Sequence, residues 1–359
     1  MTQVPLAALL DFIFLLVFPA LVTLIITPLF IAFFTKARIL AIDQQKPRKP
    51  LLPTSGGMPV LFGFLTGVLL FIAVSTFLKT TINFQLNLAV LLAAVLSTVI
   101  IVLVGFFDDL YTRQEKAVNS SGALEYRQGL RQWLKPVLTL PAAVPLMAVS
   151  AGTHYMSLPF VGVVDFGLLY PLFLVPIAVV CVSNATNMLA GLNGLEAGMG
   201  VVALSALGRF AMSHGSIEAG AIALFAAMAL IFFLLYNWYP ASILPGDSLT
   251  YFIGGAFVSA VIIGNVEKFG IIIFAPWILE ALLKLRGRFK VRSYGDLQKD
   301  GTLKAPYEKI YSLTHVAMRL PFWLGRKKGF SEKQAAGFLI LCEALLCVSA
   351  LLFYSLVTY

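Results

Sequence analysis

One stretch of the sequence decides the fold class of this chain, and it reads Leu88-Ala-Val-Leu-Leu-Ala-Ala-Val-Leu-Ser-Thr-Val-Ile-Ile-Val-Leu-Val-Gly-Phe-Phe107. It contains no charged residue, and about 20 apolar residues are what an α-helix needs to cross the hydrocarbon core of a bilayer. Two aspartates, Asp108 and Asp109, follow it directly. The stretch therefore predicts a transmembrane helix that brings a pair of carboxylates to a membrane–water boundary.

The composition of the whole chain indicates the same environment. Of its 359 residues, 59% are hydrophobic and only 12% are charged, and the mean hydropathy is +0.90. Soluble domains carry about 25% charged residues, so this composition excludes an ordinary soluble enzyme. We expect an all-α polytopic membrane protein that forms a single integral membrane domain over residues 1–359.

Ten apolar runs have roughly the length that a spanning helix requires. They cover residues 12–34, 58–77, 88–107, 134–151, 166–182, 194–212, 219–236, 249–264, 269–285 and 335–357. The fourth run holds three prolines, Pro136, Pro141 and Pro145, which predict kinks in that helix. Ten spans would place both termini on the same side of the membrane.

Basic residues are concentrated on one set of loops. The net charge is +9, and 22 of the 26 Lys and Arg residues fall on the loops that follow the odd-numbered spans, with Lys135 counted among them. Because cytoplasmic loops carry the excess of Lys and Arg in membrane proteins, this face is predicted to be cytoplasmic. Membrane topology thus accounts for the positive charge, and we expect no nucleic-acid partner.

The last large loop, residues 286–334, is expected to be a cytoplasmic insertion that binds substrate. Asp-Gly at 300–301 predicts a tight turn within a small hairpin, because glycine readily adopts a positive φ. Residues 312–328 form an amphipathic stretch that contains Phe322-Trp323 beside three basic residues. Such a stretch is typical of a helix that lies in the head-group plane; a solvated loop is the alternative.

Two acidic motifs occur at predicted span ends, and each has a purely structural alternative. The adjacent carboxylates of Asp108 and Asp109 repel each other, which favours a cation beside them, although two acids can also simply end a helix. Gly246-Asp247-Ser248 precedes the eighth span. An aspartate there can cap the helix, and it can also ligate Mg²⁺ that shares its shell with substrate phosphates.

The central motif is Asn184-Ala-Thr-Asn187-Met-Leu-Ala-Gly191-Leu-Asn193-Gly194. Asn184 and Asn187 are three residues apart, so they share a face of a helical turn, and their amide oxygens can ligate a hard cation. Gly191 and Gly194 let the backbone bend and approach a ligand closely. A polar turn between helices without any ligand is the alternative.

Lys135, Arg286 and Arg288 form a basic set on the same face. Arginine offers a fixed donor fork for phosphate oxygens, although basic residues here can also be ordinary membrane anchors. Acids, amides and basic groups beside apolar helices suit phosphoryl transfer between a soluble diphosphate and a lipid phosphate. A nucleotide-sugar or lipid-linked-sugar transporter is the alternative, and it would place polar groups near the bilayer midplane, where Glu280 and Glu343 are the main candidates.

These motifs, in this order, resemble those of the polyprenyl-phosphate N-acetylhexosamine-1-phosphate transferases. The resemblance runs from about residue 46 to 310 and includes Gly105-Phe-Phe-Asp108-Asp109. Bacterial branches carry Asp-Gly-x-Asp-Gly in the central motif and a histidine cluster in the last large loop. This chain has Ala190-Gly-Leu-Asn-Gly194 and Arg286-Gly-Arg288 instead, which is similar to the eukaryotic and archaeal UDP-GlcNAc:dolichyl-phosphate GlcNAc-1-phosphotransferases.

The resemblance implies transfer of GlcNAc 1-phosphate, or a related N-acetylhexosamine 1-phosphate, from a UDP-sugar to dolichyl or another polyprenyl phosphate. UMP would be released, and the product would be the first lipid-linked intermediate of N-glycan assembly. The implied roles are catalysis by Asp108, Asp109 and Lys135, substrate binding by Asn184, Gly191, Asn193, Arg286 and Arg288, and binding of Mg²⁺, or Mn²⁺ in its place, by Asn187 and Asp247. Gly191 and Asn193 would contact uracil. Leu244 stands where the family often has an aromatic residue that stacks on this base.

The resemblance also implies a mechanism, and the charges and termini of the chain predict a location. An oxygen of the lipid phosphate would attack the β-phosphorus of the UDP-sugar. A phosphate monoester has its second pKa near about 6, so little proton abstraction by Asp108 would be needed; a covalent aspartyl phosphate is the alternative. The loops rich in basic residues predict that the active site faces the cytoplasm. The short termini, which carry no retention signal, indicate a prokaryotic, archaeal plasma membrane, with the endoplasmic reticulum membrane as the alternative location; a homodimer is left open.

Overall fold

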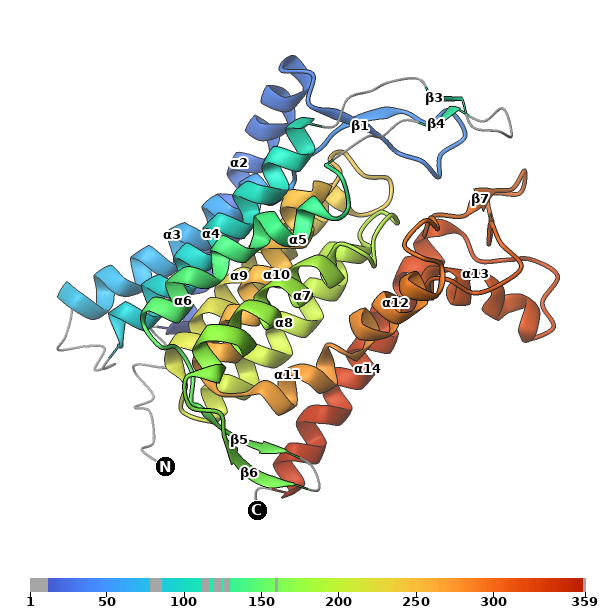
Figure 1. The fold of residues 1–359 in the computed structure, drawn as a ribbon. Coiled ribbons are helices and arrows are strands. Elements are labelled where there is room, and N and C mark those ends of the chain that lie inside the picture. The colour runs from blue at the N-terminus through green and yellow to red at the C-terminus, as the bar shows by residue number, and fades with distance from the viewer. Residues whose placement is uncertain are drawn as a thin grey trace.

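The computed structural model describes residues 12–77, 86–111, 117–118, 124–125, 130–158 and 161–357. Within these residues, seven helices are long and apolar enough to cross a membrane. They are α2 (Val17–Lys36), α3 (Gly57–Phe77), α4 (Leu88–Tyr111), α8 (Leu195–Ser213), α9 (Ile217–Asn237), α10 (Gly246–Gly264) and α14 (Glu332–Val357). The helices pack side by side in one bundle (Figure 1). The prediction of an all-α polytopic membrane protein is confirmed.

The other three predicted spans are helical but interrupted. Their elements are α5 (Leu134–Thr139), the 3₁₀ turn η1 (Leu140–Ala143) and α6 (Val144–Ala148); the π-helical turn η2 (Tyr170–Leu174) and α7 (Val175–Thr186); and α11 (Glu267–Ile273) and α12 (Ala275–Arg286). The prolines of the fourth run interrupt it as predicted. Pro276 lies in the first turn of α12, where its missing N–H is tolerated but where a preceding helix cannot continue through it.

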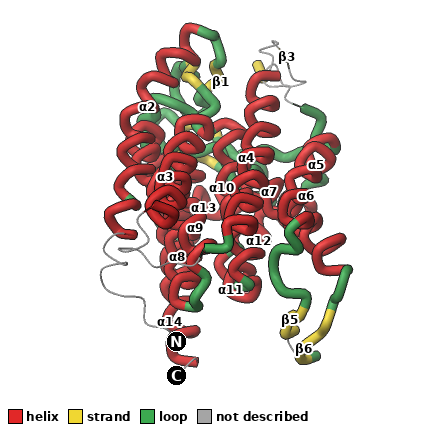
Figure 2. The backbone as a smooth tube through the Cα atoms, turned by 90° about the vertical axis from the view of Figure 1, so that its left-hand side faces the viewer, coloured by secondary structure: helices red, strands yellow, loops and turns green. Residues whose placement is uncertain are grey.

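Helix α10 lies in the middle of the bundle, as Figure 2 shows, and packs against α3, α4, α7, α8 and α9. Nearly all of its side chains are buried. Glycines bring its neighbours close: a Cβ atom at Gly254 would lie 2.8 Å from the Cα atom of Ser183 on α7. Small residues at helix contacts are typical of membrane bundles, because lipid supplies no hydrophobic force that drives helices together.

The outer surface of the bundle is apolar. Ile25 and Leu29 on α2 are 64% and 65% exposed, and Leu345 and Leu352 on α14 are 59% and 58% exposed. In water such side chains would be an aggregation hazard. They are the expected covering of a protein whose solvent is the hydrocarbon core of a bilayer.

Three small antiparallel sheets gather at one end of the bundle (Figure 1). They are β1 (Leu40–Ile42) with β2 (Leu51–Pro53), β3 (Ala117–Val118) with β4 (Leu124–Glu125), and β7 (Asp296–Leu297) with β8 (Leu303–Lys304). A fourth sheet, β5 (Tyr155–Leu158) with β6 (Gly162–Asp165), lies at the opposite end. The first three belong to the loops that are rich in basic residues, so those loops share one end of the molecule as predicted. Lys79 and most of the segment 112–129 lie outside the described residues.

The last large loop contains both elements that the sequence predicts. Gly301 has a φ of +82° in the turn between β7 and β8, although each strand is only two residues long. Helix α13 (Leu313–Trp323) begins at Ser312, whose side chain accepts a hydrogen bond from the Thr314 N–H. It ends earlier than the predicted stretch at 312–328, because the chain turns at Gly325, where φ is +75°.

We expect Gly105→Ala to lower the thermal stability of the protein. The new Cβ atom would lie 2.6 Å from the carbonyl oxygen of Asp247, so α4 and α10 would have to move apart. Gly337→Ala on α14 is the matched control, since no described residue outside its own turn of the helix comes within 4 Å of a Cβ there and alanine favours a helix by roughly 0.5–1 kcal/mol over glycine. Thermal unfolding of both variants in one detergent checks this; an unchanged Tm for Gly105→Ala would contradict the packing argument.

Candidate active site

Asp108, Lys135 and Asp247 meet at the end of the bundle where the basic loops gather. They come from the last turn of α4, the first turn of α5 and the first turn of α10. The Lys135 Nζ atom lies 2.5 Å from Asp108 Oδ2 and 2.5 Å from Asp247 Oδ2. Both carboxylates are buried. A buried charge needs a partner, and here one ammonium group is shared by two carboxylates; we call these three residues the acid–lysine cluster.

Asp109 faces a different partner from its neighbour Asp108. Its Oδ1 and Oδ2 atoms accept hydrogen bonds from the backbone N–H groups of Asp247 at 2.7 Å and Ser248 at 3.1 Å. These N–H groups are at the start of α10, where a negative charge is favourable. Gly246 has a φ of +67°, and a Cβ atom there would lie 2.4 Å from Asp109 Oδ2. Asp109 therefore caps α10 and fixes the position of Asp247.

The two asparagines of the central motif also take separate roles. Asn187 follows α7 directly, and its Nδ2 atom donates to Asp247 Oδ2 at 3.0 Å. Asn184 lies one turn earlier, accepts from the Tyr251 hydroxyl at 3.2 Å and donates to the carbonyl oxygen of Val180 at 2.8 Å. Asn187 thus joins the acid–lysine cluster, whereas Asn184 connects α7 to α10.

The donor set around Asp247 fits a hard divalent cation that is shared with a substrate. Asp247 and Asp108 supply carboxylate oxygens and Asn187 supplies an amide, and Mg²⁺ typically takes one or two carboxylates and completes its shell with water and phosphates. Among the described residues, no group of three or more His, Cys, Asp or Glu side chains is arranged to hold a metal ion.

A cavity of about 330 Å³ lies beside the cluster. Asn187 and Asp247 form one part of its wall, and Gly191 and Asn193 of the central motif form another. Residues 40–44, residues 244–246 and Ser293-Tyr294 of the last large loop also line it, together with Thr54, Glu196, Thr250 and the residues of the central motif next to Asn187 and Gly191. The structure thus brings the predicted metal ligands and the predicted base-binding residues to a single cavity.

Gly191, at the edge of this cavity, forms hydrogen bonds through both its N–H and its carbonyl oxygen. Its φ is +109°, a conformation that favours glycine. Its N–H donates to Glu196 Oε1 at 2.7 Å, and its carbonyl oxygen accepts from Gln45 Nε2 at 2.6 Å. Gln45 Oε1 in turn accepts from the Gly295 N–H at 3.2 Å. Gln45 therefore joins the central motif to the last large loop.

Asn193 is engaged by a second set of polar groups. Its Nδ2 atom donates to Asp43 Oδ2 at 3.1 Å, and its N–H donates to Glu332 Oε1 at 2.8 Å. Lys46 forms ion pairs with both of these acids. The sequence patterns assign no role to Asp43, Gln45 or Glu332. A polar run at residues 43–46, directly after the apolar residues of β1, is the feature that could have marked the first two as candidate site residues.

The structure does not bring Arg286 and Arg288 to the cluster. Both side chains are exposed, and neither lines the cavity. The Arg286 guanidinium lies 5.8 Å from the ring centre of Tyr311. Arg288 and Phe289 have positive φ angles of 52° and 57°, so the chain turns sharply after α12. As a result, Ser293 and Tyr294 line the cavity in place of the two arginines.

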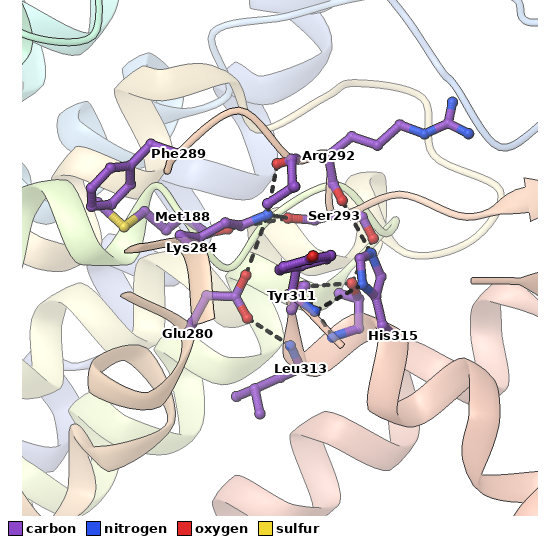
Figure 3. A network of polar contacts seen from close by, with 12 residues as sticks. Met188, Glu280, Lys284, Phe289, Arg292, Ser293, Tyr311, Leu313 and His315 are labelled. Atoms are coloured by element: carbon purple, nitrogen blue, oxygen red, sulfur yellow. Dashed lines mark hydrogen bonds and ion pairs between the residues drawn. The ribbon is translucent and has the colours of Figure 1, made fainter. Parts of the chain in front are cut away.

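A buried lysine holds this part of the loop in position (Figure 3). Lys284 of α12 is 7% exposed, and its Nζ atom contacts Ser293 Oγ at 2.5 Å, the carbonyl oxygen of Val291 at 3.2 Å and Glu280 Oε1 at 3.5 Å. The other oxygen of Glu280 accepts from the Leu313 N–H at 2.7 Å, at the start of α13. Lys284 and Glu280 therefore tie α12 to residues 291–294, which we call the strap, and to α13.

Helix α13 contacts the strap directly as well. Thr314 Oγ1 donates to the carbonyl oxygen of Ser293 at 2.5 Å, and His315 Nε2 lies 3.0 Å from the carbonyl oxygen of Arg292. Burial, and then the nearby charge of Lys284, lower the pKa of His315 to about 4. The ring is therefore neutral at neutral pH. Because Nδ1 accepts from the Tyr311 N–H at 3.3 Å, the proton is on Nε2, which donates to Arg292.

The resemblance implies that UMP is the product released from this cavity, and we expect Lys284→Met to weaken the binding of UMP about tenfold, a loss of about 1.4 kcal/mol. Without the ammonium group, Ser293 and Val291 lose their shared partner, and the strap is held in the cavity wall less firmly, although its contacts with Thr314 and His315 remain. Isothermal titration of the purified protein measures the affinity, and thermal unfolding checks that the variant is folded. Lys290→Met is the matched control, since Lys290 is exposed on the same loop. Equal UMP affinity for the two variants would contradict the role of Lys284.

Comparison with known proteins identifies the chain's relatives. A family model described as glycosyl transferase family 4 matches residues 91–265, from α4 to the end of α10. A protein of Saccharolobus solfataricus, provisionally named UDP-N-acetylglucosamine–dolichyl-phosphate N-acetylglucosaminephosphotransferase, is 34% identical over 343 residues, which cover 91% of this chain and 96% of the relative.

Two further relatives come from a eukaryote and a bacterium. The Dictyostelium discoideum protein named UDP-N-acetylglucosamine–dolichyl-phosphate N-acetylglucosaminephosphotransferase is 28% identical over 72% of this chain and 67% of its own length. A phospho-N-acetylmuramoyl-pentapeptide-transferase of Shouchella clausii is 29% identical over 75% of this chain and 80% of its own length. The archaeal similarity extends over nearly the full length of both proteins, and from it we conclude that this chain belongs to glycosyl transferase family 4.

Proposed function

We propose that this protein transfers N-acetylglucosamine 1-phosphate from UDP-GlcNAc to dolichyl phosphate or a related polyprenyl phosphate and releases UMP. The observation that carries this proposal is the 34% identity, over 91% of the chain, to an archaeal relative named for that activity. The acid–lysine cluster beside a cavity, at one end of an apolar bundle, is the arrangement that such a reaction needs. The product would be the first lipid-linked intermediate of N-glycan assembly.

The cavity suits the soluble substrate. The uridine would lie against Gly191 and Asn193, and the diphosphate would then lie near Asn187 and Asp247, which line the same cavity. Leu244 also lines it, so the base would meet an aliphatic side chain in place of an aromatic ring. Within residues 286–334, Ser293 and Tyr294 would complete the wall, which supports the interpretation of this loop as a substrate-binding insertion.

We propose that Asp247 and Asn187 hold Mg²⁺, with Asp108 beside them. The donor set fits this ion, as the chemistry of carboxylate and amide oxygens indicates. When bound, the ion would neutralise charge on the diphosphate. Mn²⁺ has the same ligand preferences and is expected to substitute for it.

The protein's own groups contribute chiefly charge and alignment. A lipid phosphate oxygen would form a new bond to the β-phosphorus while the bond to the bridging oxygen breaks and UMP leaves with that oxygen. Lys135 would stabilise negative charge that develops during this step. Asp108 orients Lys135, and its Oδ1 atom accepts from the Leu130 N–H at 2.6 Å, just before α5. Because the attacking phosphate is already largely dianionic, the reaction needs no strong base.

The transporter interpretation has less support in the arrangement of polar groups. Glu280 contributes to the network around the strap, and buried Glu343 contacts Cys347 Sγ at 3.3 Å on α14. The remaining polar motifs lie at one end of the bundle. We propose that this end faces the cytoplasm at an archaeal plasma membrane, since two archaeal relatives are 34% and 33% identical to this chain.

We expect purified protein to release UMP from UDP-GlcNAc only when both a polyprenyl phosphate and Mg²⁺ are present. Dolichyl and undecaprenyl phosphate are compared as acceptors, and UDP-GalNAc and UDP-glucose serve as alternative donors. Release that depends on lipid and metal supports the proposed reaction. Folded protein that releases no UMP with any donor would refute it.

We expect Lys135→Met to lower turnover roughly 10²–10³-fold, because it removes the cation that stabilises charge in the reacting complex. It also leaves Asp108 and Asp247 without their shared partner. Lys309→Met is the control, since Lys309 is exposed on the last large loop. The kcat of both variants is measured by UMP release at saturating UDP-GlcNAc and Mg²⁺. Turnover above half of the wild-type value for Lys135→Met would contradict this assignment.

A further inference from the structure

The last large loop encloses a second hollow, of about 730 Å³, which shares no lining residue with the cavity beside Asp247. The β7–β8 hairpin forms one side, α13 forms another, and the segment that returns from α13 to α14 closes the third. Leu303 and Met318 at its base are fully buried. The catalytic proposal uses none of these residues.

The hollow is built into the fold. The Leu303 N–H donates to the carbonyl oxygen of Phe330 at 2.8 Å, and Thr302 pairs with Ser331 in an antiparallel bridge. The returning segment passes close to the hairpin: a Cβ atom at Gly329 would lie 3.1 Å from the carbonyl oxygen of Leu303. These contacts fix the hairpin and the returning segment relative to each other, and α13 packs against β8 on the third side.

The lining of the hollow is strongly basic. Lys299, Lys304, Arg319 and Lys327 line it, against one acid, Asp300. The Asp300 carboxylate accepts hydrogen bonds from the Thr302 N–H and hydroxyl, which lower its pKa. Arg319 donates to the carbonyl oxygen of Tyr307. Within the described part of the chain, none of the three lysines forms an ion pair with a carboxylate, so their charges can accept an anion.

The hollow lies next to an apolar surface. Phe322, Trp323 and Leu324, at the end of α13, are 47%, 56% and 67% exposed, and the basic run Arg326-Lys327-Lys328 follows them. Aromatic side chains beside lysine and arginine are typical of a segment in the membrane interface. Figure 1 shows α13 extending sideways from the bundle beside α14. Phe322, in the last turn of α13, and Lys327, in the basic run that follows the helix, both line the hollow.

We propose that this hollow binds the phosphate head group of an anionic membrane phospholipid, with the acyl chains beside Phe322 and Trp323. Three lysines without carboxylate partners provide the charge complementarity for a phosphate. The apolar rim favours a lipid over a free anion, because a soluble phosphate would gain nothing from exposed aromatic rings. The bound lipid would hold α13 at the membrane surface, and α13 contacts the strap through Thr314 and His315.

The test measures lipid retention and does not depend on transferase activity. The full-length protein is reconstituted in nanodiscs of phosphatidylcholine with increasing phosphatidylglycerol, and native mass spectrometry measures the phosphatidylglycerol that stays bound. The test variant is Lys299→Gln/Lys304→Gln/Lys327→Gln. The matched control, Lys36→Gln/Lys309→Gln/Lys333→Gln, removes the same charge from exposed lysines outside the hollow. If the triple variant unfolds on heating earlier than the control, the double variant Lys304→Gln/Lys327→Gln replaces it.

We expect the wild type and the control to retain phosphatidylglycerol in preference to phosphatidylcholine, and the hollow variant to bind it at least about tenfold more weakly. Undiminished retention by the hollow variant would overturn the proposal. Equal losses in both variants would also overturn it, since they would indicate attraction by overall charge. Inorganic phosphate is added in a parallel series. Displacement of phosphatidylglycerol by phosphate at equal concentration would show a free-anion site and overturn the choice of a lipid.

Discussion

The close approach of α4 to the start of α10 is the constraint on which the rest of the site depends. Gly105 leaves no space for a side chain between the two helices, and Asp109 accepts the first N–H groups of α10. A helix start buried without such a partner would carry unsatisfied donors. This one contact joins two helices that are far apart in the sequence, and it places Asp247 where Lys135 and Asp108 can reach it.

The membrane explains why the polar groups gather at one end. Lipid cannot satisfy polar groups of the backbone or side chains, so the central helices meet through small residues, and the charged motifs lie in the terminal turns of the helices and in the loops next to them. Within that end, burial still requires partners for every charge. Lys135 between two carboxylates, Lys46 between Asp43 and Glu332, and Lys284 beside Glu280 all meet this requirement.

The cavity wall is assembled from segments that are distant in the chain. Gln45 hydrogen-bonds to both Gly191 and Gly295, and Lys284 hydrogen-bonds to Ser293 of the strap. The cavity, in which we propose that the soluble substrate binds, is therefore coupled to α12 and α13, at the membrane boundary. Such coupling suits an enzyme whose second substrate is a lipid, because both substrates must meet at the same surface.

The sequence by itself determined which segments are helical, that the protein belongs in a membrane, and that Asp108, Lys135, Asn187 and Asp247 are candidate site residues. Apolar runs and short polar motifs are local patterns, so they can be recognised from the sequence alone. Only the tertiary structure decided that Asp109 turns toward α10 while Asp108 turns toward Lys135. It also decided that Gln45 and Lys284 support the cavity. The cavity is lined by Ser293 and Tyr294, and not by the two arginines of residues 286–288. Adjacent residues on a helix point in different directions, and the partners that each one meets come from remote segments, so these assignments depend on packing in three dimensions.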